Sequence, residues 1–145
     1  MAAISVDHIG IIVSNRESAE RFVRDVLGLE PSDREPQGSN SAFYRCGETD
    51  IQLLQIDDPV IRERRLGKGN IARLEHIAIK VDDVLEEMHR LQEAGVELLS
   101  PDPIRSPHGR SGFTTDRGGL GIVLQLVDSV NDAGQGPSGE PPVHG

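Results

Sequence analysis

A chain of 145 residues, of which 36% are hydrophobic, is long enough to bury the core of one ordinary domain. Its formal net charge of −9 argues against nonspecific binding to nucleic acid and to anionic membranes, because both need a basic surface. The single cysteine, Cys46, excludes an intrachain disulfide and a multi-cysteine zinc cluster.

We expect neither a membrane-spanning helix nor a secretory signal. No apolar run approaches about 18 residues. Residues 1–5 lack the basic and apolar regions of a signal peptide. We therefore expect a cytoplasmic protein without a membrane partner or a nucleic-acid partner.

One pattern occurs twice, as DHIGIIV at 7–13 and as EHIAIKV at 75–81. In both copies an acidic residue precedes a histidine, His8 or His76, and aliphatic residues follow at every second position. This period of two predicts two strands, each with an aliphatic face and with its histidine on the other face. Two histidines in equivalent places of a repeated unit are the main indication of function.

The first repeated module, residues 4–56, is predicted to have the order βαβββ. Gly28 ends its helix, and Pro31 places the second strand at an edge of the sheet. In chain order we expect a strand 4–13, a helix 16–27 with one apolar stripe, an edge strand 29–34, a loop 35–40, and a hairpin of strands 41–46 and 50–56.

The segment 57–72 separates the two modules. It carries Pro59, two glycines and the charged centre RERR at 62–65. This composition predicts a solvated linker with one helical turn. The alternative is an arginine patch beside a phosphate or carboxylate of a substrate.

The second module, residues 73–128, repeats the βαβββ order. Gly95 ends its helix in the way that Gly28 ends the first. We expect a strand 73–82, a helix 84–94, a strand 96–99, a loop 105–109, a strand 110–115, a glycine-rich turn 117–121 and a strand 122–127. The two modules are predicted to form one α+β domain, residues 1–128, with a curved mixed sheet. The composition of residues 129–145 predicts a disordered tail.

Each module also carries a glutamine in its last strand, Gln52 or Gln125, opposite the aliphatic positions. If the aliphatic faces pack on the helices, His8, Gln52, His76 and Gln125 all point to the concave side of the sheet. Two imidazoles and two amide oxygens suit a divalent cation with open positions for water or substrate. A lone histidine on a strand is more often a hydrogen-bonded core or surface residue, so the prediction depends on the recurrence of both residue types.

These features resemble the vicinal oxygen chelate superfamily of glyoxalases, bleomycin-resistance proteins and dioxygenases, and above all its methylmalonyl-CoA epimerases. The resemblance covers about residues 4–128. It implies paired βαβββ modules in a half-barrel that encloses a metal cavity, the metal ligands His8, Gln52, His76 and Gln125, and a homodimer. The metal would be Co, Mn, Ni, Zn, Mg or Fe. The motifs on which the resemblance to this superfamily rests are VDHIGI (6–11), RDVLGL (24–29), DIQLL (50–54), LEHIA (74–78) and HG (108–109) before the last glycine-rich turn.

Two departures from the family concern carboxylates. The family usually has a glutamate where this chain has Gln125. In the epimerases a glutamate directly before a Gln-Gly pair is a catalytic base, whereas here Pro36 precedes that pair and Glu35 lies one residue earlier. Glu35 and the loop residue His108 are therefore the candidate catalytic proton carriers.

The resemblance implies a metal-dependent isomerase, such as an epimerase, or a lyase that acts beside a carbonyl. Its small-molecule substrate would be an acyl-CoA thioester or a related compound. One alternative is a metal-free binding or resistance protein of the same fold, although the chain has few aromatic residues for a stacking cleft. The other is a ring-cleaving dioxygenase, although its iron needs a carboxylate where Gln125 stands. The sequence leaves the substrate, the metal and the catalytic base open.

Overall fold

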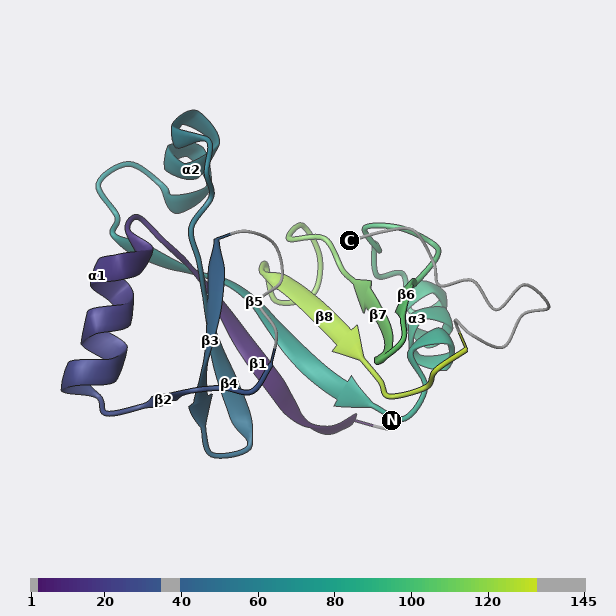
Figure 1. Cartoon of the computed structure of the whole chain (residues 1–145). Helices are drawn as coiled ribbons and strands as arrows, with labels where there is room; N and C mark the ends of the chain where they lie inside the picture. Colours follow the sequence, from purple (N-terminus) through teal and green to yellow (C-terminus); the bar gives the residue numbers. More distant parts are fainter. Residues whose placement is uncertain (1–2, 35–39, 133–145) are drawn as a thin grey trace. The chain divides into compact units, whose positions relative to one another are not determined.

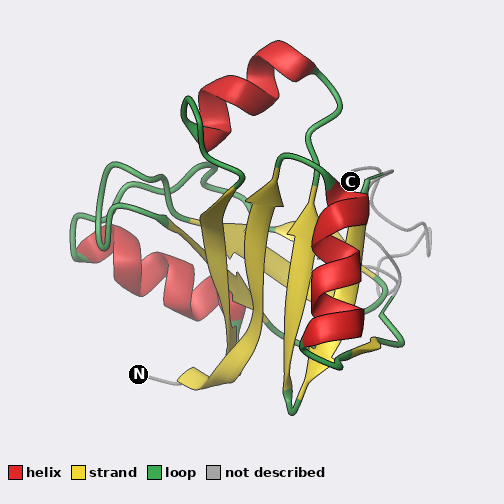
Figure 2. Ribbon diagram, turned by 90° about the vertical axis from the view of Figure 1, so that its left-hand side faces the viewer, coloured by secondary structure: helices red, strands yellow, loops and turns green. Residues whose placement is uncertain are grey.

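The computed structural model describes residues 3–34 and 40–132. The chain divides into two compact units, each a mixture of helices and strands (Figure 2). One unit, called here the histidine unit, is His8–His76. The other, called here the C-terminal unit, joins the residues up to Asp7 to those from Ile77 onward.

The histidine unit contains a mixed sheet. Within it the strands follow the order β2-β3-β4-β1-β5, in which β1 and β4 are parallel and the β2–β3 and β3–β4 pairs are antiparallel (Figure 1). The edge position of the short β2 was predicted from Pro31. The elements are β1 (Ala3–Val13, here from His8), α1 (Arg16–Arg21), η1 (Phe22–Val26), β2 (Glu30–Pro31), β3 (Ser41–Cys46), β4 (Thr49–Leu54), α2 (Pro59–Leu66) and the first half of β5 (Ala72–Val81).

The helix predicted over 16–27 forms, but it changes its winding. Asn15 caps α1 through a hydrogen bond of 2.8 Å from the backbone N–H of Ser18. The last turn, η1, is a π-helix, in which the N–H of Leu27 donates to the carbonyl of Phe22. The expected single apolar stripe is wrong in part: Val23 is buried, whereas Phe22, Val26 and Leu27 are exposed.

The aliphatic positions of the histidine unit pack against this helix. Val13, Leu53 and Tyr44 form the core with Val23. Ile11 and Ile51, which alternate with polar positions on their strands, pack on the same cluster. The predicted alternation is therefore confirmed: the face opposite the helix is the one that carries His8, Gly10 and Gln52.

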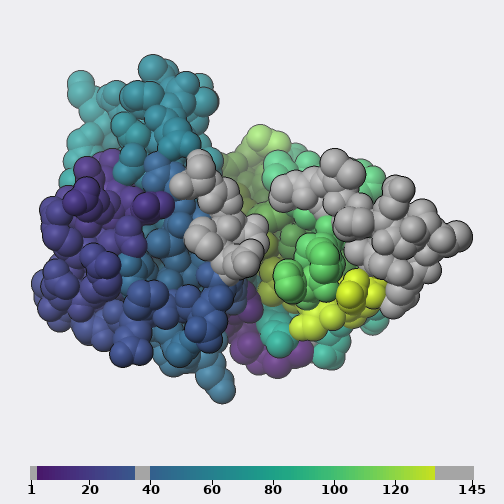
Figure 3. Space-filling view, in the orientation of Figure 1, coloured from purple at the N-terminus to yellow at the C-terminus, as the bar shows by residue number. Residues whose placement is uncertain are grey.

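The linker is more helical than predicted. Instead of one turn, α2 comprises eight residues. Asp58 caps it by accepting from the N–H groups of Val60 and Ile61, and Pro59 occupies the first turn, where a proline is favoured. In the space-filling view, α2 stands at the surface of its unit (Figure 3).

The C-terminal unit repeats the βαβββ order, which confirms the α+β class with paired modules. Its strand order is β5-β8-β7-β6. Val81, Val84, Met88 and Leu126 form its core. The elements are the second half of β5, α3 (Val84–Glu93), β6 (Ile104–Ser106), β7 (Gly109–Phe113) and β8 (Val123–Val127).

Two predicted elements of this unit are wrong. The segment 96–99 makes a single bridge, Leu98 to Thr114, instead of a strand, because Pro101 and Pro103 lack the N–H groups that would extend the pairing. The segment 104–106, predicted mostly as loop, is β6. It pairs with β7 across a short turn, where Ser106 Oγ donates to the carbonyl of Gly109.

Asp128 connects α3 and Arg110 in the C-terminal unit, although the sequence analysis placed it at the border of the predicted tail. Its side chain is fully buried and accepts from the N–H of Val84 at 2.7 Å, so it caps α3 from the end of β8. The guanidinium of Arg110 pairs with Asp128 at 2.8 Å and with Asp132 at 3.1 Å. The predicted tail beyond 132 lies outside the described residues. In the part of the chain that is described, no helix has the length and hydrophobicity of a membrane span.

Candidate functional site

The two repeated histidines meet inside the histidine unit. The Nε2 atoms of His8 and His76 lie 3.0 Å apart, and the two rings are nearly perpendicular, with an interplanar angle of 88°. Both side chains are buried, with exposed fractions of 4% and 6%. The repeat therefore brings its two imidazoles into direct contact.

A glycine makes room for this contact. A Cβ atom at Gly10 would lie 2.1 Å from Cε1 of His76, which is far inside the contact distance of two carbon atoms. Gly10 stands two residues after His8 on β1, so it shares the face that carries that histidine. Any side chain at this position would displace the ring of His76.

The outer nitrogen of each ring also has a partner. Nδ1 of His76 lies 2.6 Å from Oε1 of Glu75, and the other oxygen of that carboxylate pairs with Arg65 at 3.0 Å. Nδ1 of His8 lies 3.0 Å from Nη1 of Arg34. Burial alone would raise the pKa of Glu75, but the hydrogen bonds and charges of His76 and Arg65 hold that pKa below its usual value.

The donors and acceptors among these partners indicate where each ring carries its proton. Arg34 has only donors, so Nδ1 of His8 must accept, and a neutral His8 then carries its proton on Nε2. That N–H donates to Nε2 of His76. His76 therefore carries its proton on Nδ1 and donates it to the carboxylate of Glu75.

Gln52 lies on the same face of the sheet as these residues. It is directly opposite Gly10 on the parallel neighbour β1 and opposite Phe43 on β3. It is 5% exposed. The ring of Phe43 stands edge-on to the ring of His8, with 5.6 Å between the centroids. Three of the four predicted ligands, His8, Gln52 and His76, thus share one face of one unit.

The remaining predicted residues lie elsewhere. Gln125 is in the C-terminal unit, opposite Phe113 on β7, while its neighbour Leu126 faces the core beside α3. Its predicted alternation is thus confirmed, and its role as a ligand stays a prediction. His108 is exposed in the turn between β6 and β7. Glu35 lies outside the described residues.

The geometry of the histidine pair fits one divalent cation. Cation–nitrogen distances of about 2.1 Å at a right angle place two ligand nitrogens about 3.0 Å apart, and the two Nε2 atoms have this separation. Glu75 supplies the carboxylate that commonly orients a ligand histidine. Among residues 3–34 and 40–132, no three His, Cys, Asp or Glu side chains gather as a metal cluster. Gln52, on the same face, offers an amide oxygen as a further ligand.

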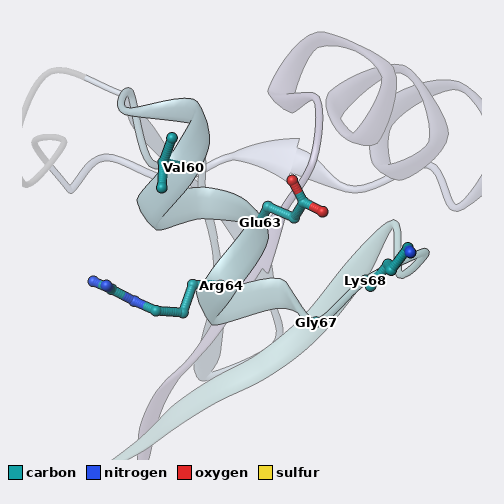
Figure 4. A pocket seen from close by; sticks show the side chains of 5 residues that line it. All are labelled: Val60, Glu63, Arg64, Gly67 and Lys68. Atoms are coloured by element: carbon teal, nitrogen blue, oxygen red, sulfur yellow. The ribbon is translucent and has the colours of Figure 1, made fainter.

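A hollow of about 370 Å³ lies on α2 and is separate from this arrangement (Figure 4). It is lined by Val60, Glu63, Arg64, Gly67 and Lys68. One of them, Arg64, belongs to the arginine patch that the sequence offered as an alternative for 62–65. Of the arginines proposed from the sequence as an anion patch, Arg62 donates to the carbonyl of Ile56, and Arg65 pairs with Glu75.

Sequence reasoning missed three residues of the site. Glu75 carried a signal, since an acidic residue precedes the histidine in both copies of the repeat. Gly10 also carried one, because it stands within the repeated motif at a strand position where glycine is unfavourable. Arg34 carried none, because its contact with His8 joins residues 26 positions apart.

Known proteins share this sequence pattern and fold. The family model "Glyoxalase/Bleomycin resistance protein/Dioxygenase superfamily" matches residues 5–124. An ethylmalonyl-CoA/methylmalonyl-CoA epimerase of Cereibacter sphaeroides is 31% identical over 110 residues, which are 72% of this chain and 82% of that protein.

Two solved structures extend the comparison. Methylmalonyl-CoA epimerase from Mycobacterium tuberculosis shares the fold with a TM-score of 0.76 and 22% identity, over 93% of this chain and 94% of that one. A variant of the Streptomyces coelicolor methylmalonyl-CoA epimerase in complex with 2-nitronate-propionyl-CoA has a TM-score of 0.71 and 26% identity, over 89% of this chain and 99% of that one. The chain belongs to the glyoxalase/bleomycin resistance protein/dioxygenase superfamily.

Proposed function

We propose that the protein is a metal-dependent isomerase that moves a proton beside the carbonyl of an acyl-CoA thioester, as an epimerase does. The observation that carries the proposal is the 3.0 Å separation of the two Nε2 atoms on the face that also holds Gln52. The family membership and the names of the relatives support the reaction class. The complex of the Streptomyces coelicolor relative supports an acyl-CoA substrate.

His8, Gln52 and His76 would hold the divalent cation, with Gln125 of the C-terminal unit as the proposed fourth ligand. All four side chains are neutral in this role, so the cation would keep its full charge. A cation in this place supplies electrostatic stabilisation of the negative charge that develops on the carbonyl oxygen.

The protein's own residues prepare this site. Glu75 accepts the Nδ1 proton of His76 and thereby keeps Nε2 of that ring available as a ligand. Gly10 leaves the space that the ring occupies. Phe43, which is 5% exposed, covers the edge of His8 and excludes water from that side. Glu35 and His108 stay the candidate proton carriers.

The test is loss of the α-proton of methylmalonyl-CoA to deuterated water, measured by NMR or mass spectrometry on purified protein with and without added Co²⁺. We expect exchange that needs the metal and disappears in His8→Ala and His76→Ala. Glu35→Gln and His108→Gln separate the two proton carriers, and the exposed His89→Ala is the control. The absence of exchange from methylmalonyl-CoA and from every other acyl-CoA tried would contradict the proposal.

Two further results would refine it. Tight uptake of an acyl-CoA by metal-free protein without exchange would favour the binding-protein alternative. A gain of exchange in Gln125→Glu would mean that the native chain has lost part of the epimerase machinery. Homodimer formation and the cytoplasmic location stay predictions, and light scattering checks the first.

A further inference from the structure

We propose that Arg34 competes with the divalent cation for His8. Arg34 holds His8 in the tautomer whose Nε2–H group pairs with His76, and in that tautomer Nε2 of His8 cannot bind a metal. Arg34 is thus a positioning residue that must withdraw when the site is loaded. The inference rests on the proposed function in one respect, namely that the cation binds between His8 and His76.

Several contacts fix the guanidinium of Arg34. Its Nη1 atom lies 3.0 Å from Nδ1 of His8, and its Nε atom lies 3.3 Å from Oδ2 of Asp50. Its Cζ atom stands 4.9 Å from the centroid of the Phe43 ring. Asp50 is itself held by a hydrogen bond of 2.8 Å from Ser32 Oγ. The contact with His8 therefore belongs to a supported arrangement of five side chains.

The two histidines differ in readiness for a metal. His76 carries its proton on Nδ1, toward Glu75, so its Nε2 atom already has a lone pair directed at His8. His8 carries its proton on Nε2, because Arg34 donates to its Nδ1 atom. A cation needs the lone pair of both Nε2 atoms, and only one of the two is available.

To bind the cation, His8 must move its proton from Nε2 to Nδ1. The new Nδ1–H would face the N–H of Arg34, and two donors cannot form a hydrogen bond. Arg34 must therefore leave, which also removes its positive charge from the neighbourhood of the cation. A hydrogen bond from a charged donor contributes about 1.5 kcal/mol or more, so we expect about a ten-fold gain in metal affinity when Arg34 is replaced.

The test measures Co²⁺ binding to the full chain by isothermal titration calorimetry. The variant is Arg34→Gln, whose amide oxygen can accept from Nδ1 of His8. The control is Arg45→Gln, which removes an equal charge from β3 of the same unit, where the exposed Arg45 pairs with Asp33 at 3.0 Å. We expect Arg34→Gln to bind about ten-fold more tightly than the wild type, and Arg45→Gln to bind about equally to it.

A second measurement needs no metal. In ¹⁵N-labelled metal-free wild type, the long-range ring spectrum should assign the proton of His8 to Nε2 and that of His76 to Nδ1. In Arg34→Gln the proton of His8 should move to Nδ1. A wild-type His8 with its proton on Nδ1 would overturn the inference whatever the metal affinities are.

The outcomes separate the two proposals. If all three proteins bind Co²⁺ with equal affinity, Arg34 does not compete and only the present inference fails. If Arg34→Gln and Arg45→Gln gain affinity equally, charge alone accounts for the effect, and the inference fails in the same way. If none binds Co²⁺, the metal site of the proposed function fails, and the competition fails with it.

Discussion

The Nδ1 atom of His76 lies 2.6 Å from Oε1 of Glu75, so the residue directly before the second histidine determines the tautomer of its ring. In a strand, neighbouring side chains point to opposite faces. Glu75 nevertheless reaches its neighbour, and Arg65 from α2 holds the other oxygen of its carboxylate. The orientation of His76 therefore depends on a helix that the sequence predicted as a largely solvated linker.

Replacing Glu75 by glutamine should weaken the binding of Co²⁺ by about ten-fold or more, because an outer partner of a ligand histidine typically contributes that much to metal affinity. Calorimetric titration of both proteins measures the effect. Glu63→Gln, which changes an exposed glutamate of α2, is the matched control. Equal affinities of Glu75→Gln and the wild type would show that the carboxylate does not prepare the ring.

Gly10→Ala should lower the free energy of unfolding by about 1–3 kcal/mol, because the new methyl group overlaps the ring of His76 in a packed interior. Urea denaturation measures this difference. Gly118→Ala is the control, because no atom lies within 4 Å of a Cβ atom built there. A loss of stability that is the same in both variants would contradict the steric explanation.

Asp128→Asn should destabilise the protein by about 3 kcal/mol at pH 7, since it leaves the buried guanidinium of Arg110 without its full counter-charge. Burial alone would raise the pKa of Asp128, but Arg110 and the backbone N–H groups lower it below the ordinary 3.8. This carboxylate therefore stabilises the fold above about pH 3.8, and its contribution is lost as the pH falls through the lower pKa of the folded state.

The difference between wild type and Asp128→Asn should accordingly be constant near neutral pH and shrink below about pH 4. Unfolding by urea at several pH values measures it. Asp102→Asn, at an exposed position between two prolines, is the control and should change stability little. A difference that persists unchanged to pH 2 would contradict the assignment.

Tyr44 should titrate far above the usual range of a tyrosine. Burial and the hydrogen bond from its hydroxyl to Glu20 raise its pKa to about 12. Because it is the only tyrosine and the chain has no tryptophan, the rise of tyrosinate absorbance reports on this residue alone. We expect the rise near pH 12 in the folded protein and near pH 10 after denaturation.

The raised pKa has a consequence for stability. The contribution of Tyr44 is fully present below pH 10 and is lost as the pH rises toward about 12. Tyr44→Phe should therefore lose less stability than the wild type between these two values, as thermal unfolding would show. Parallel losses in both proteins would contradict this expectation.

The sequence predicted those features that depend on local pattern. Alternation in 7–13 and 75–81 was enough to place His8 and His76 on the faces that they occupy, because the side-chain period of a strand is two. It was also enough to place Leu53 and Leu126 in the two cores. The repeat supplied the βαβββ order twice, and with it the fold class.

Features that depend on distant partners could not be predicted in this way. Asp128 contributes to stability through its contacts with Arg110 and with the first turn of α3. Neither contact produces a periodic pattern in the sequence. The pairing of β6 depends on the turn to β7 rather than on alternation within its three residues. Likewise, the contact of Arg34 with His8 joins a residue outside the helices and strands to a strand.

The absence of a side chain at Gly10 offers a rule for sorting uncharacterised sequences of this superfamily. A bulky residue at the corresponding place is incompatible with a second imidazole seated as it is here, since both would claim the same volume. Homologues that keep both histidines but carry valine or leucine there should hold the second imidazole in a different position. Such chains would be poor choices for transferring an enzymatic assignment, however similar the rest of their sequence.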